Sequence, residues 1–211
     1  MRAAILIALL GLTSPAVAAD LGNAPLAGDR RILSHLSVEP HAVAGLGYQH
    51  GLSVRGHALA LSAHLDLPLY LLDGHHHRLA LAARSPVLLR GPWRLDARVQ
   101  VQEQSTDSAL FRGTALGLGA GLWGGFSRPG GWVGLDLGLR GNPATWMRPT
   151  DDVGPTGWYG ATGGFVELGL GGGLTLARRV EVGARVGVDR TLAGGSRTAP
   201  LAAGLGVDLL L

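Results

Sequence analysis

The sequence contains no cysteine and no lysine, and beyond residue 19 it contains no long apolar run. The absence of cysteine excludes a disulfide framework and a lipid anchor on an N-terminal cysteine, so stability must come from packing or from a membrane. All 18 basic residues are arginine, whose planar fork pairs well with carboxylates in confined places. The net charge of +3 is small and dispersed, which excludes the basic stripe typical of nucleic-acid binding.

Glycine is abundant, with 35 residues, although the mean hydropathy of the chain is +0.25. A transmembrane helix needs about 18 to 20 consecutive apolar residues, and helix interiors tolerate glycine poorly. The glycines lack a three-residue period, which excludes a collagen helix. High hydropathy, many glycines and short apolar runs together favour a membrane β-barrel.

Residues 1–19 have the pattern of a cleaved secretory signal peptide. Arg2 supplies the basic start, Ile5–Leu12 is the apolar segment, and small residues at Ala16–Ala19 predict cleavage before Asp20. The apolar segment is too short to span a bilayer as a helix, and the alternative is a retained N-terminal anchor. The signal predicts export from the cytoplasm.

The clearest strand is Trp93–Gln102, in which apolar and polar residues alternate without exception. Alternation with a period of two indicates a strand with one apolar and one polar face. The pattern recurs from Val54 to Leu211 in eight segments of about the 9 to 11 residues that cross a bilayer at a tilt. Short and long connections alternate as in outer-membrane barrels, and Asn142–Gly157 is predicted to be the longest loop.

The predicted fold is therefore an all-β, transmembrane, antiparallel up-and-down β-barrel over residues 54–211 with eight strands. A ten-strand alternative uses Ile32–Val38 and Ala42–Gln49 as an additional hairpin. Otherwise residues 20–53 are expected to form an N-terminal arm or plug. A water-soluble sandwich or lipocalin-like barrel is the competing architecture.

Aromatic residues are expected to form girdles at the two membrane interfaces. The predicted members are Tyr70, Trp93, Phe111, Trp123, Phe126, Trp132, Trp158 and Tyr159. With this pattern, residues 54–211 resemble the small bacterial outer-membrane barrels of the OmpA/OmpX type, although the usual C-terminal aromatic residue is replaced by Leu211. The resemblance implies insertion into the outer membrane by the barrel assembly machinery, with lipid and lipopolysaccharide as surroundings.

The inward faces of the predicted strands carry six arginines and seven carboxylates, which nearly cancel in charge. An eight-stranded barrel is just wide enough to be filled by side chains, and unpaired charges inside it are costly. Paired charges therefore predict a closed lumen. The network consists of Asp66, Arg78, Arg84, Arg94, Asp96, Arg98, Asp136, Arg140, Glu167, Glu181, Arg185, Asp189 and Asp208.

Ser62, His64 and Asp66 are residue types of a catalytic triad and are weak candidates for one. They occupy alternate positions of a single strand, about 6.5–7 Å apart, whereas a triad needs contacts of about 2.6–3.2 Å. His75–His77 and Asp151–Asp152 are expected to be solvated loop residues, so no metal or other cofactor is predicted.

The sequence supports three functional classes. The favoured class is a structural or surface-interaction barrel that acts through its external loops, with a ligand that the sequence does not identify. The alternatives are a narrow pore or transport component, and a lipid-modifying outer-membrane enzyme, for which no catalytic motif is present.

Overall fold

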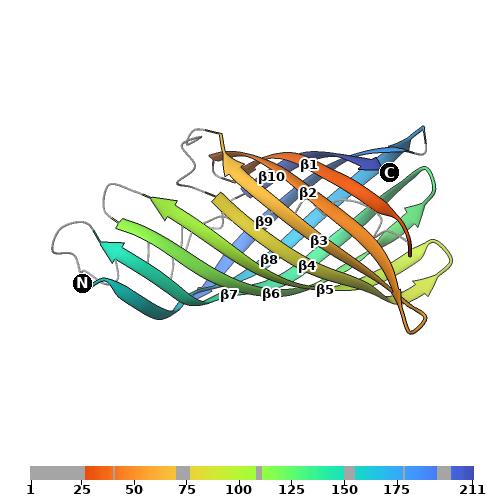
Figure 1. Cartoon of the computed structure of the whole chain (residues 1–211). Coiled ribbons are helices and arrows are strands. Elements are labelled where there is room, and N and C mark those ends of the chain that lie inside the picture. Colours follow the sequence, from red (N-terminus) through yellow and green to blue (C-terminus); the bar gives the residue numbers. More distant parts are fainter. Residues whose placement is uncertain are drawn as a thin grey trace.

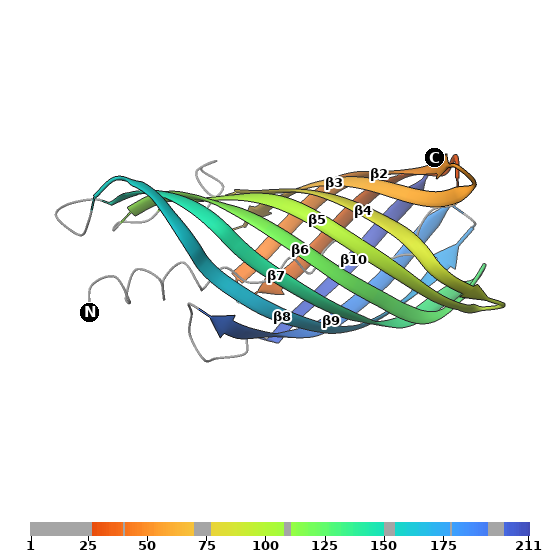
Figure 2. The same cartoon turned by 90° about the horizontal axis from the view of Figure 1, so that it is seen from below.

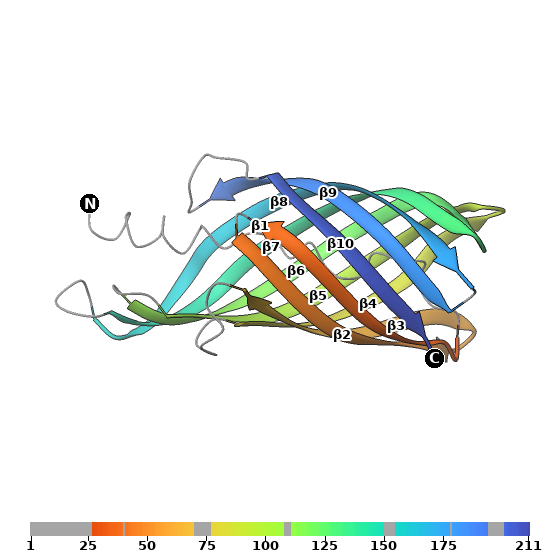
Figure 3. The same ribbon diagram turned by 90° about the horizontal axis from the view of Figure 1, so that it is seen from above.

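The computed structural model describes residues 27–39, 41–69, 77–107, 111–149, 155–177, 179–193 and 201–211, which form one closed antiparallel β-barrel (Figure 1). Each strand is hydrogen-bonded to its neighbours in sequence, and β1 closes the ring by pairing with β10 (Figure 3). The strands are β1 (Arg30–Glu39), β2 (His41–Val54), β3 (His57–Pro68), β4 (His77–Arg90), β5 (Trp93–Asp107), β6 (Phe111–Arg128), β7 (Gly131–Pro149), β8 (Gly157–Leu176), β9 (Val180–Ala193) and β10 (Leu201–Leu210). In this part of the chain, no helix is long and apolar enough to cross a membrane.

The prediction of eight strands is wrong, and the ten-strand alternative is confirmed. The additional hairpin is β1 and β2, so the barrel begins at Arg30 instead of near residue 54. Two features hide this hairpin in the sequence. Ser34 interrupts the apolar face of β1, where its hydroxyl donates to the Val207 carbonyl at 2.6 Å. In β2, alanines and glycines make the two faces alike in hydropathy.

The barrel is apolar outside and charged inside, as the alternation predicts. On β7 the outward-facing residues Val133, Leu135, Leu137 and Leu139 are all more than half exposed. Between them, Asp136 and Arg140 face inward and are only 7% and 3% exposed. A water-soluble protein buries apolar side chains and exposes charges, so this wall has the opposite polarity. Such a wall is suited to contact with lipid.

The connections of β2 to β3, β4 to β5, β6 to β7 and β8 to β9 are all short and lie at one end of the barrel, together with the C-terminus (Figure 1). We call this the short-turn end and the opposite end the long-loop end. The turn between β2 and β3 consists of Arg55 and Gly56, with φ of 51° and 81°. Two central residues with positive φ are what a type I′ hairpin turn requires, because its twist matches that of the flanking strands. The other short turns join β4 to β5, β6 to β7 and β8 to β9.

In the segment predicted to be the longest loop, Asn142–Gly157, most of the described residues are strand. β7 continues to Pro149 and β8 begins at Gly157, and both reach past their neighbours at the long-loop end (Figure 2). Pro143 lacks the N–H that a ladder hydrogen bond requires, and the register between β7 and β8 shifts between Asn142 and Ala144. β7 therefore continues beyond a bulge, at the position where the sequence pattern predicts that the strand ends.

Candidate functional site

The charged interior is the most distinctive feature of the molecule. All thirteen residues of the predicted network lie on the inner face of the wall, eleven of them fully buried and the other two, Arg94 and Arg185, with side chains no more than 10% exposed. The structure adds Arg31 of β1, which is buried. The sequence prediction does not include Arg31, because it contains this strand only in the ten-strand alternative. With Arg31, the interior network contains seven arginines and seven carboxylates. The local pattern needed to find Arg31 is partly present, because Arg31, His35 and Ser37 alternate with Ile32, Leu36 and Val38, although Ser34 interrupts the apolar face.

One group of contacts surrounds the carboxylate of Asp96, which is fully buried. Arg84 donates to Asp96 Oδ2 through Nε at 2.7 Å, and its Nη2 lies 2.6 Å from the same oxygen. Arg94 donates through Nε to Asp96 Oδ1 at 2.5 Å. The Arg84 guanidinium also lies 5.0 Å from the centre of the Trp123 ring, within the range of a cation–π contact. The Asp96 carboxylate thus contacts two arginines, and one of them also lies against an indole ring.

Trp123 and Trp132 lie inside the barrel, so their predicted place at the membrane interface is wrong. Their rings pack edge to face with centroids 6.1 Å apart, a favourable geometry for aromatic pairs. Trp132 Nε1 donates to Glu181 Oε1 at 2.6 Å, and Glu181 Oε2 lies 3.2 Å from Arg31 Nη1. These contacts link β6 and β7 with β9 and β1 across the interior.

Glycines on the adjacent strands make room for the two indoles. A Cβ at Gly134 would lie 2.5 Å from Trp123 Cζ2, and a Cβ at Gly173 would lie 2.6 Å from Trp132 Nε1. Both distances are too short for real atoms, so a larger residue at either position would displace the ring. The glycine-rich inner faces of the wall therefore make room for the two tryptophan rings.

A second group of contacts forms a chain of alternating charges through the middle of the barrel. Asp136 lies between Arg98 and Arg185, with N–O distances of 3.4 Å and 3.3 Å. Arg140, whose side chain is fully buried, lies 3.0 Å from Glu167. A 4.0 Å contact between Arg98 and Glu167 joins these two parts. The members in order are Arg185, Asp136, Arg98, Glu167, Arg140 and Asp189.

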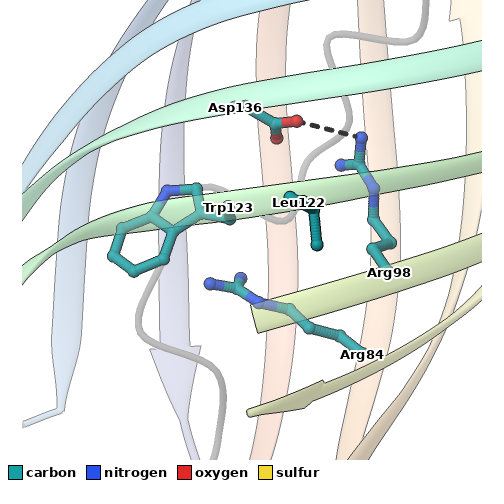
Figure 4. A pocket seen from close by; sticks show the side chains of 5 residues that line it. All are labelled: Arg84, Arg98, Leu122, Trp123 and Asp136. Atoms are coloured by element: carbon teal, nitrogen blue, oxygen red, sulfur yellow. Dashed lines mark hydrogen bonds and ion pairs between the residues drawn. The ribbon is translucent and has the colours of Figure 1, made fainter. Parts of the chain in front are cut away.

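The space between the two groups is small. A cavity of about 10 Å³ is lined by Arg84, Arg98, Leu122, Trp123 and Asp136 (Figure 4). A cavity needs about 10–15 Å³ to hold one water molecule, so this one admits at most a single water. Side chains therefore leave little free space between the two groups.

The three candidate catalytic residues lie on the inner face of β3 and are buried. Arg78 contacts Asp66 Oδ2 through Nε at 2.8 Å and through Nη2 at 2.6 Å. His35 Nε2 lies 3.4 Å from Asp66 Oδ1. Asp66 is thus engaged by Arg78 and by His35 of β1, a histidine that the sequence analysis did not consider. The Asp66 carboxylate therefore serves as the ion-pair partner of an arginine.

No group of three His, Cys, Asp or Glu side chains suited to a metal ion occurs among the residues that the structure describes. His75 and His76 and the pair Asp151–Asp152 lie outside the described residues. His77 is described, and its Nε2 lies 3.1 Å from Glu103 Oε2 near the long-loop end.

Outward-facing aromatic residues are present at both ends of the wall. At the short-turn end, Trp93 and Phe126 meet edge to face with centroids 5.6 Å apart, and Arg128 lies 4.9 Å from the Phe126 ring centre. At the long-loop end, Trp158 is 64% exposed and faces outward.

Trp146 lies directly opposite Trp158 in the register of β7 and β8. The sequence analysis missed Trp146 because it placed this residue in a loop. Tyr159 pairs with the inward-facing Thr145 and so lies on the inner face, where its hydroxyl donates to the Pro155 carbonyl at 2.6 Å. Tyr70 and the side chain of Phe111 lie outside the described residues.

No protein-family profile and no curated protein matches the chain. Solved structures do match. An outer membrane channel from Pseudomonas putida F1 is 12% identical with a TM-score of 0.57, over 92% of this chain and 99% of that one. The outer membrane protease OmpT from Escherichia coli is 8% identical with a TM-score of 0.45, over 86% of this chain and 90% of that one. Ail, the attachment invasion locus protein of Yersinia pestis, is 9% identical with a TM-score of 0.43, over 87% of this chain and 99% of that one.

These identities are too low to transfer a function, and the likeness to the channel concerns the fold. The resemblance to small outer-membrane barrels is confirmed at that level, and the chain has the fold of a bacterial outer-membrane β-barrel.

Proposed function

We propose that this chain is an outer-membrane β-barrel with a lumen closed by ion-paired side chains, which acts as a structural or surface-interaction protein through its longer connections. Export through the predicted signal at residues 1–19, and insertion by the barrel assembly machinery, are parts of the proposal. The short-turn end then faces the periplasm and the long-loop end faces the exterior.

The polarity of the wall supports the membrane placement. Large apolar side chains are exposed on every strand, and the thirteen charged residues of the predicted network lie inside. In water, so continuous an apolar surface would drive association, because monomeric soluble proteins rarely expose apolar patches larger than a few hundred Å². A water-soluble lipocalin-like barrel would have the opposite arrangement.

The observation that carries the closed lumen is the series of side-chain contacts running around the inside of the wall. It leads from Arg31 through Glu181, Trp132 and Trp123 to Arg84. These residues belong to β1, β9, β7, β6 and β4, so the contacts extend around most of the circumference. Because the adjoining cavity holds at most one water, the arrangement favours a sealed interior over a passive pore.

A lipid-modifying enzyme is not supported by the candidate residues. Ser62, His64 and Asp66 are buried on the inner face, whereas lipid would contact the outer face. Asp66 is also occupied by Arg78 at 2.6 Å. We therefore expect the variant His64→Ala to leave lipid A profiles unchanged.

Planar-bilayer recordings test the closed lumen. The unmodified chain should give no steady conductance steps, whereas Trp123→Ala combined with Trp132→Ala should give discrete steps because the two indoles are removed from the lumen. Leu135→Ala, on the outer face of β7, is the matched control and should remain silent. Reproducible steps from the unmodified chain would reject the closed lumen in favour of a narrow pore.

A further inference from the structure

Two arginines lie directly opposite each other on the outer face near the long-loop end. Arg112 of β6 pairs with Arg148 of β7, and both side chains are exposed. Directly opposite residues on adjacent strands have Cβ atoms about 4.5–5.5 Å apart, and like charges in such a pair destabilise the sheet. Asp107 of β5 contacts Arg112 at 2.6 Å on the other side. Among the described side chains, this cluster therefore offers one carboxylate for two guanidinium groups.

Two tryptophans follow on the same face, one step closer to the middle of the barrel. Trp146 of β7 lies directly opposite both Thr114 of β6 and Trp158 of β8. Trp158 is exposed. Tryptophan is enriched where apolar lipid meets the headgroups, because its ring is apolar and its N–H is polar.

The vertical position of these residues agrees with a membrane boundary. From Thr114 to Phe126, β6 rises about 30 Å along the barrel axis, given about 3.3 Å per residue and a tilt of about 40°. The apolar band of an outer-membrane barrel is about 25 Å tall between its aromatic girdles. With Phe126 at the inner girdle, Trp146 and Trp158 lie at the outer girdle. The two arginines then lie at the level of the outer headgroups.

We propose that the outer-rim cluster, consisting of Asp107, Arg112, Trp146, Arg148 and Trp158, binds the phosphate group of a lipid A headgroup in the outer leaflet. This proposal rests on the proposed membrane placement and orientation. A phosphate between Arg112 and Arg148 accepts charge-assisted hydrogen bonds from both forks and removes their mutual repulsion. The tryptophans below it contact the sugar and the first carbons of the acyl chains.

The short-turn end provides a matched comparison. Arg90 and Arg128 are also exposed beside outward-facing aromatics, but they lie on β4 and β6, with β5 between them. They are therefore not a directly opposed pair, and they face the other leaflet. The double variant Arg90→Gln/Arg128→Gln removes the same charge without touching the outer-rim cluster.

The test is titration of the purified full chain in detergent micelles with bisphosphorylated lipid A, with bound lipid counted by native mass spectrometry. We expect Arg112→Gln combined with Arg148→Gln to weaken binding about tenfold, as the loss of two charge-assisted contacts predicts, and the Arg90/Arg128 variant to change it less than about twofold. Equal losses in both variants would overturn the assignment, because binding would then depend on net charge alone.

A second measurement needs no variant and decides the matter if the double variant does not fold. Dephosphorylated lipid A should bind the unmodified chain about tenfold more weakly than bisphosphorylated lipid A does. Phosphatidylglycerol should also bind more weakly than bisphosphorylated lipid A. If either of these two lipids binds as tightly as bisphosphorylated lipid A, the lipid A phosphate site is rejected. Heat-modifiable gel mobility and insertion into lipid vesicles test the membrane placement separately, so a failure of the proposed function is distinguishable from a failure of this site.

Discussion

The carboxylate of Asp96 offers the sharpest test of the ion-paired interior. It is fully buried and holds Arg84 at 2.6 Å and Arg94 at 2.5 Å. Asp96→Asn keeps the shape of the side chain but removes the negative charge that contacts both arginines. Removing one partner of a buried ion pair costs about 3–5 kcal/mol, because the remaining charge is left uncompensated. We therefore expect the free energy of unfolding to fall by about 3–5 kcal/mol.

Urea unfolding in lipid vesicles, followed by tryptophan fluorescence, measures this change. Asp107→Asn is the control, since its partner Arg112 is 62% exposed and surface ion pairs contribute at most about 1 kcal/mol. Adding Arg84→Met to Asp96→Asn removes one of the two arginines and should recover part of the loss, as a double-mutant cycle would show. If Asp96→Asn lowers the free energy of unfolding no more than Asp107→Asn does, the buried ion pairs do not stabilise the barrel as proposed.

Two further substitutions test the packing of the interior and the surroundings of the wall. At Gly45 a Cβ would overlap His35 Cε1, so Gly45→Ala should destabilise the barrel by about 1–3 kcal/mol, whereas Gly164→Ala, with open space around its Cβ position, should change stability by less than about 0.5 kcal/mol in the same urea assay. Leu139→Arg, on the outer face at mid-height, should cost about 2–4 kcal/mol in vesicles, and unchanged stability there would contradict a lipid-facing wall.

The local pattern predicts the faces of the strands well. Side-chain direction in a strand follows a period of two, so each strand carries its own information about which residues face inward. Arg98 and Asp136 were assigned to the interior on this basis, and both are buried there. The same rule would have placed Trp123 inside, since it follows the outward-facing Leu122. An aromatic ring near a strand end is also typical of an interface girdle, but in this barrel the alternation determines the side on which Trp123 lies.

The contacts between strands are not predictable in this way. Arg31 meets Glu181 although 150 positions separate them, because closure of the ring and the stagger of the strands bring β1 near β9. The number of strands was also uncertain, since the Ala- and Gly-rich β2 offers little hydropathic contrast between its faces. The continuation of β7 past Pro143 depends on a bulge that only pairing with β8 reveals.

The seam between β1 and β10 has a consequence for how this chain assembles. Every other strand pair joins sequence neighbours through a hairpin, but the seam brings Arg31 opposite Leu210, almost the full chain length away. Closing so long a loop costs about 5 kcal/mol of chain entropy by the (3/2)RT ln n rule. The hydrogen bond from Leu211 N to the Arg30 carbonyl at 2.9 Å extends this pairing to the last residue. We therefore expect closure of this seam to be a slow, non-local step of assembly, before which the edges of β1 and β10 are open to pairing with other chains.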